Sequence, residues 1–172
     1  MVERSAEQRQ TPGRPRILYR ARAQVPGDRS YGLLAEILTG MVASLHSAGP
    51  AVIEAGRTWG RHLVERSPPS EQVGLEDAIA RLRRVLEAVG FQPLLHTGTD
   101  GVQIKLHNCP FREVATRHTD VVCAIHLGMM QGALAEQRAP VDAESLGPFV
   151  TPTLCVAQLR APADLVLPDA QR

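Results

Sequence analysis

Apolar residues recur along this chain at the three-and-four spacing of amphipathic helices. The clearest repeat predicts a helix over residues 70–90 that stops at Gly90. Its apolar positions are Leu75, Ile79, Leu82, Leu86 and Val89. Further helices are predicted over residues 31–47, 50–66 and 121–136, and a short one within 110–118. The apolar stripe of the 31–47 helix is unusually wide. The pattern leaves open whether it is buried within the monomer or forms a dimer interface.

Four other stretches have the alternating or continuous apolar pattern that is typical of β-strands. Residues 91–97 and 102–108 are predicted to form a strand pair around the turn at 98–101. In the second strand, Val102, Ile104 and Leu106 share one face. Two more strand-like runs cover 141–146 and 153–160. The order of helices and strands therefore predicts an α+β fold, with helices packed on an antiparallel sheet of about four strands.

Polar and turn-forming residues mark the expected boundaries. Ser70 is predicted to cap the 70–90 helix and Asp120 the 121–136 helix, and Pro26-Gly27-Asp28 predicts a turn. Val52, Trp59 and Leu63 are expected to share one face of the 50–66 helix. Residues 1–13 are polar and lack periodicity, so we expect them to be disordered.

Composition and charge narrow the class of protein. A length of 172 residues suits one domain with a short arm, and an aromatic content of 3% requires an aliphatic core. The net charge of +1 creates no overall attraction to nucleic acid or membranes, although residues 1–23 hold six arginines against two glutamates. Neither a bilayer-spanning apolar run nor a signal peptide is visible, so we expect a cytoplasmic protein without a membrane partner.

The candidate chemistry lies in three widely spaced cysteines, an odd number that does not suggest a disulfide framework. Cys109 follows a strand within "KLHNCPF", Cys123 is in the first turn of the predicted 121–136 helix, and Cys155 is in the last strand. Such positions can converge at one sheet edge, and His126 shares a helix face with Cys123. Three thiolates and an imidazole would suit zinc or an iron–sulfur cluster. The alternative is that all three are small buried apolar residues.

A thiol enzyme is a further alternative, with Cys109 as nucleophile and His107 or His118 as its base. The sequence offers no evident acid to orient such a base, so we expect no enzymatic activity.

The run "HNCPFREVATRHTDVVCAIHLGMMQGAL", followed by "TLCV", resembles the C-terminal sensor half of bacterial winged helix-turn-helix transcription regulators, which are ArsR-like and similar to SufR-type iron–sulfur repressors. The resemblance implies that Cys109, Cys123 and Cys155 hold an iron–sulfur cluster or zinc. The fourth SufR-type ligand has no matching cysteine here, and His126 is our choice for that position, with His107 as the other candidate. "PGRPRILYR" resembles the wing strand of this family, which implies DNA contacts by Arg14 and Arg16.

On this resemblance the chain divides into four parts. We expect a flexible basic arm that is the remnant of a wing (1–23), a helical dimerisation or linker region (24–69), an α+β sensor domain (70–161) and a frayed tail (162–172). No helix pair precedes the wing segment, so DNA binding requires an attached winged-helix domain. The expected function is the sensor and dimerisation part of a homodimeric regulator that senses metal, an iron–sulfur cluster or redox state. A stand-alone module that binds metal or a small molecule, without DNA binding, is the alternative from another class.

Overall fold

The computed structural model describes residues 2–6, 17–21, 26–45, 48–66, 68, 71, 73–98 and 101–161. The chain forms two compact units, Met1–Glu36 and Ile37–Arg172. In the first unit, strand β1 (Val2–Ala6) pairs antiparallel with β2 (Ile17–Ala21), from Val2 opposite Ala21 to Ala6 opposite Ile17. The prediction of disorder is therefore wrong for residues 2–6. The partner of this polar strand lies more than ten residues away, and local sequence does not reveal such pairing.

The second unit is built on a four-stranded antiparallel sheet in the order β3-β4-β6-β5, which confirms the predicted α+β class. The strands are β3 (Gln92–Gly98), β4 (Gly101–His107), β5 (Asp142–Thr151) and β6 (Leu154–Arg160). Val102, Ile104 and Leu106 are buried on one face of β4, as their alternation predicts. The neighbouring strand β6 buries Cys155, Ala157 and Leu159 in the same way.

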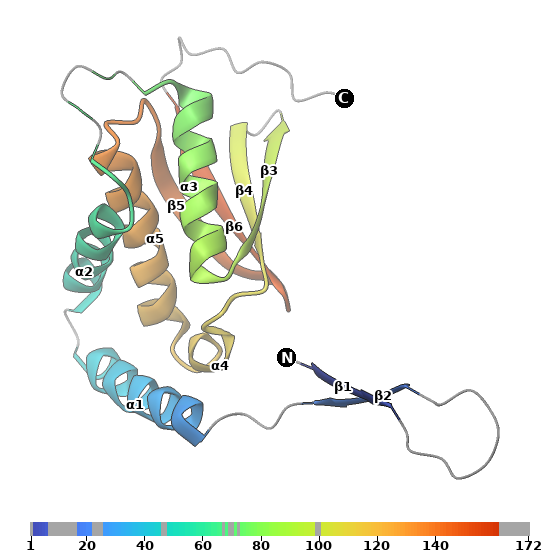
Figure 1. The fold of residues 1–172 in the computed structure, drawn as a ribbon. Helices are drawn as coiled ribbons and strands as arrows, with labels where there is room; N and C mark the ends of the chain where they lie inside the picture. Colours follow the sequence, from blue (N-terminus) through green and yellow to red (C-terminus); the bar gives the residue numbers. More distant parts are fainter. Residues whose placement is uncertain are drawn as a thin grey trace. The chain divides into compact units, whose positions relative to one another are not determined.

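Helices α3 (Leu75–Val89) and α5 (Thr119–Glu136) lie side by side over one face of this sheet, and α2 (Ala48–His62) packs along α5 (Figure 1). The short helix α4 (Arg112–Ala115) leads from β4 into α5. The core lies between the sheet and the two helices, and α3 contributes four of its predicted apolar positions. These are Leu75, Ile79, Leu82 and Leu86. Gly90 ends α3 as predicted, because its φ of 113° is a left-handed conformation that favours glycine.

Several predicted boundaries are wrong. Helix α1 spans Pro26–Ala43, so the expected turn at Pro26 is the first turn of a helix, where proline is well tolerated. Helix α3 begins after Gly74, and Ser70 lies outside the described residues. Helix α5 begins at Thr119, which places Asp120 inside its first turn instead of at the cap. Local patterns locate the helices correctly, whereas their ends depend on tertiary contacts.

Large apolar side chains remain exposed on α1 and α2. Seven large apolar residues on α1 and just beyond its end expose between 49% and 75% of their surface. They are Tyr31, Leu33, Leu34, Ile37, Leu38, Met41 and Leu45. Ile37, Leu38, Met41 and Leu45 are therefore not buried within the second unit. Trp59 on α2 is 68% exposed, whereas Val52, two turns earlier on the same helix, is buried. Within the described residues, no helix is long and apolar enough to cross a membrane.

Candidate thiol site

Cys109 leaves the sheet at the end of β4. The preceding residue, Asn108, has a φ of 53°, and asparagine tolerates this left-handed conformation better than most residues do. The chain then turns, and the carbonyl of Cys109 accepts a hydrogen bond from the Arg112 N–H at 3.2 Å, where α4 begins. This turn leaves the Cys109 side chain partly exposed.

Cys155 faces the core from β6, opposite Leu106 of β4. Its Sγ accepts a hydrogen bond from the backbone N–H of Phe149 at 3.3 Å. Phe149 has a φ of 47°, and the register between β5 and β6 shifts between Gly147 and Thr151. A bulge of this kind turns the backbone N–H away from the normal ladder, and here it points at a sulfur atom.

Cys123 is the fifth residue of α5. The helix starts two residues earlier than predicted, so Cys123 lies beyond its first turn. Only the N–H groups of the first turn lack a backbone acceptor within the helix. The helix N-terminus therefore supports its thiolate less than the sequence led us to expect. Burial raises the pKa of the Cys123 thiol, and together with smaller contributions from the Cys155 and Cys109 thiols and Asp120 it brings that pKa to about 12.

Neighbouring thiols contribute to the raised pKa values of both Cys109 and Cys123. The pKa of Cys109 is also raised, first by burial and then by Cys155, while a backbone hydrogen bond to Phe111 and the charge of Arg112 act in the opposite direction. Cys109 and Cys155 line one cavity of about 210 Å³. Asn108, Arg112, Phe149 and Thr153 complete much of its wall. The cavity therefore brings together the strand end at Cys109 and the neighbouring strand at Cys155, and Cys123 of α5 is not among its lining residues.

His126 occupies a different environment from the thiols. Its ring is 4% exposed and its centroid lies 5.1 Å from those of both Phe91 and Phe111. Burial between these rings lowers the pKa of His126 to about 4. The imidazole is therefore neutral at pH 7, which is the form that binds metals, but it is held by aromatic packing.

The donor set does not form a metal centre as it stands. Among the described residues, no group of three or more His, Cys, Asp or Glu side chains could hold a metal ion. Cys109, Cys123 and Cys155 are near one another without the closed tetrahedral arrangement of a structural site. The expected DNA-contact residues Arg14 and Arg16 lie outside the described residues.

The sequence analysis missed the close contact between α2 and the cysteine-bearing helix α5. We call this contact the helix seam, and it is lined by Gly56, Gly60, Gly128 and Gly132. A Cβ atom at Gly56 or Gly60 of α2 would overlap a backbone carbonyl of α5. The same holds in reverse for Gly128 and Gly132 of α5 against carbonyls of α2. The signal was a glycine pair at four-residue spacing in both helices, which allows two helix backbones to approach closely.

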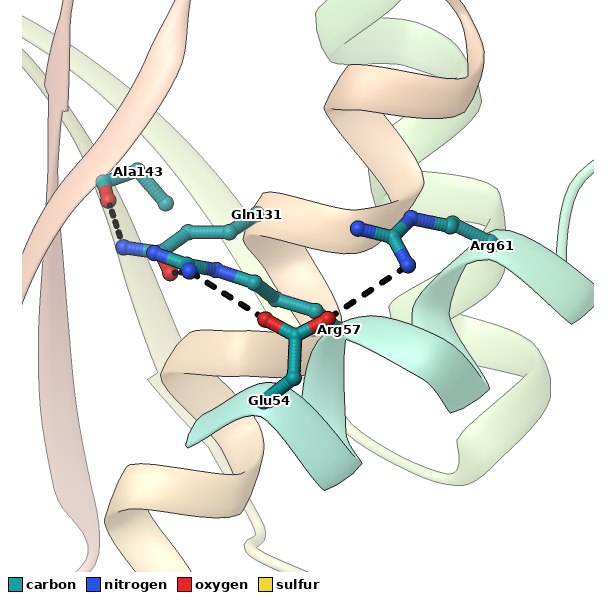
Figure 2. Close-up of polar contacts among 5 residues, drawn as sticks. All are labelled: Glu54, Arg57, Arg61, Gln131 and Ala143. Carbon is teal, nitrogen blue, oxygen red and sulfur yellow. Dashed lines mark hydrogen bonds and ion pairs between the residues drawn. The ribbon is translucent and has the colours of Figure 1, made fainter. Parts of the chain in front are cut away.

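A polar network reinforces this seam (Figure 2). Arg57 Nε of α2 donates to Gln131 Oε1 of α5 at 2.9 Å, and Gln131 Nε2 donates to the carbonyl of Ala143 in β5 at 2.8 Å. Glu54 lies between Arg57 and Arg61, with N–O distances of 3.4 and 3.5 Å. One glutamine therefore ties α2 and the sheet to the same turn of α5.

Comparisons of the sequence with protein families, with curated proteins and with solved structures find no match. The fold is that of an α+β protein with three neighbouring free thiols.

Proposed function

We propose that this chain is the sensor and dimerisation part of a bacterial transcription regulator, and that Cys109, Cys123 and Cys155 are its responsive group. The observation that carries the proposal is the cavity that Cys109 and Cys155 line together, with Cys123 close enough that both thiols contribute to its raised pKa. The stimulus would be a thiophilic metal, an iron–sulfur cluster or an oxidant, all of which act on thiols. The β1–β2 hairpin is compatible with the wing implied by "GRPRILYR".

The fold offers a route from the thiols to the rest of the chain. Cys123 lies on α5, and α5 is joined to α2 by four glycines in backbone contact. Backbones in such close contact move together, because no flexible side chains lie between them. A change at the thiols that shifts α5 would shift α2 and so alter the placement of α1, which leads to the hairpin.

A thiol enzyme has less support. Burial raises the pKa of both Cys109 and Cys123, so little of either thiol is ionised at pH 7. Catalytic cysteines need the opposite shift, because the thiolate is the nucleophile. Binding of a soft metal remains compatible with raised pKa values, since a coordinating thiol loses its proton to the metal's charge. The cavity beside Cys109 and Cys155 gives a small ligand access to two of the sulfurs.

The test begins with anaerobically purified protein, from which bound metal and visible absorbance are measured. The reduced, metal-free protein is then titrated with zinc, with cadmium and with a peroxide, while the fluorescence of Trp59 is followed. Trp59 is the chain's only tryptophan and lies on α2, so it reports movement of that helix and not the thiols directly. We expect metal or oxidant to change its emission.

Single serine substitutions of Cys109, Cys123 and Cys155 should each weaken this response, whereas His96→Ala, at an exposed position on β3, should leave it intact. Protein that binds neither metal nor cluster, and whose thiols stay unreactive in the native state, would refute the sensor proposal. A response that survives all three substitutions would do so as well.

A further inference from the structure

Helix α1 exposes its apolar stripe, whereas an ordinary surface helix buries such a stripe. The half-buried positions on its second half are Glu36, Thr39, Gly40 and Val42. Gly40 faces His118, the residue before α5, since a Cβ at position 40 would lie 3.7 Å from Cε1 of His118. Ile37, Leu38 and Met41 point away from this side and are more than half exposed. A helix normally buries its apolar face, so this arrangement calls for a partner.

The size of the stripe fits a protein–protein interface. Large apolar side chains at this exposure present on the order of 100 Å² each. The seven residues together offer roughly 700 Å², which is close to the approximately 800 Å² per partner of a standard interface. A contiguous exposed patch of this size is uncommon on monomeric proteins.

The charge pattern identifies the kind of partner. Between Tyr31 and Leu45 the sequence holds one charged residue, Glu36, and no basic residue. Helices that lie on membrane surfaces carry basic residues on their polar side, and nucleic-acid contacts need the same charge. A surface nearly free of charge can face its own copy without repulsion, as the charge-depleted centre of a dimer interface does.

We propose that the apolar stripe of α1 is the surface through which two copies of this chain associate. This inference deepens the proposed function, whose regulator is a homodimer, by naming the interface. The two α1 helices pack stripe to stripe about a twofold axis, with Leu34, Leu38 and Met41 near the centre. The interface lies on a helix that precedes α2, and α2 is joined to the cysteine-bearing α5.

Sedimentation equilibrium of the full chain, reduced and with chelator, tests the proposal independently of the thiols. We expect a dimer in the micromolar range. The double variant Leu38→Glu, Met41→Glu should raise the dimer dissociation constant by about 100-fold or more, because two charges would be buried without partners. The matched control is Leu94→Glu on β3, an equally exposed leucine in the monomer. The control should dimerise as the wild type does.

Circular dichroism confirms that each variant keeps its fold, and hydrogen exchange of α1 separates the other outcomes. A monomeric wild type with rapidly exchanging α1 overturns the proposal. A monomeric wild type with protected α1 also overturns it, because another segment of the same chain then covers the stripe. A dimer that is insensitive to Leu38→Glu, Met41→Glu overturns it too. Loss of the thiol response with an intact dimer would instead refute the sensor proposal alone.

Discussion

His126 makes the stability of this protein depend on pH in a window set by one buried ring. The ordinary pKa of a histidine is 6.5, and burial lowers that of His126 in the folded protein to about 4. Between these values the unfolded chain binds a proton that the folded chain rejects. The free energy of unfolding therefore falls as the pH drops below 6.5, and this loss levels off below about pH 4. At about 1.4 kcal/mol per tenfold change in proton affinity, the loss is about 3 kcal/mol.

The assay is urea unfolding at a series of pH values from neutral to about pH 4, followed by far-ultraviolet circular dichroism. His126→Phe keeps an aromatic ring against Phe91 and Phe111 but cannot be protonated. We expect this variant to lose about 3 kcal/mol less stability than the wild type over the same range. The same substitution at the exposed His96 is the control and should follow the wild-type curve.

Other groups contribute to acid destabilisation without obscuring this difference. The Arg66 guanidinium lowers the pKa of Glu136 in the folded protein, so that group loses its contribution as the pH falls through the acidic range. This loss is shared by the wild type and His126→Phe and cancels when the two are compared. If both proteins lose the same stability between neutral pH and pH 4, the reasoning about His126 is refuted. Direct titration of the ring by proton NMR provides the second check.

Three further predictions concern the helix seam and the thiols. Gly56→Ala should lower the free energy of unfolding by about 2 kcal/mol or more, because the new methyl group meets the backbone of α5. The control is Gly49→Ala, in open space on the same helix, which should be neutral or stabilising by up to about 1 kcal/mol. Thermal unfolding measures both. Gln131→Ala should cost about 1–2 kcal/mol in urea unfolding, since it removes the hydrogen bonds to α2 and β5; an unchanged midpoint would mean that the network is dispensable. In alkylation followed by mass spectrometry, the partly exposed Cys109 should react before the buried Cys123, at a rate that rises with pH, and the reverse order would contradict the assigned burial.

The thiol site was only half visible in the sequence. The strand end before Cys109, the helix that carries Cys123 and the last strand with Cys155 were each predicted in about the right place. The place of His126 did not follow. Its spacing from Cys123 put both residues on one helix face, but Phe91 and Phe111 come from segments that the helical period cannot identify. Aromatic packing, not helical spacing, decides where that ring lies.

The sequence by itself determined the α+β class, the apolar face of α3, the left-handed stop at Gly90 and the inward face of β4, because each depends on local periodicity or on the backbone freedom of one residue. Only the tertiary structure decided which apolar stripes are buried. The stripes of α1 and α3 both repeat at helical spacing, yet the apolar residues of α3 are buried and those of α1 are exposed. Burial depends on what lies opposite a face, and that is a property of segments far apart in the chain.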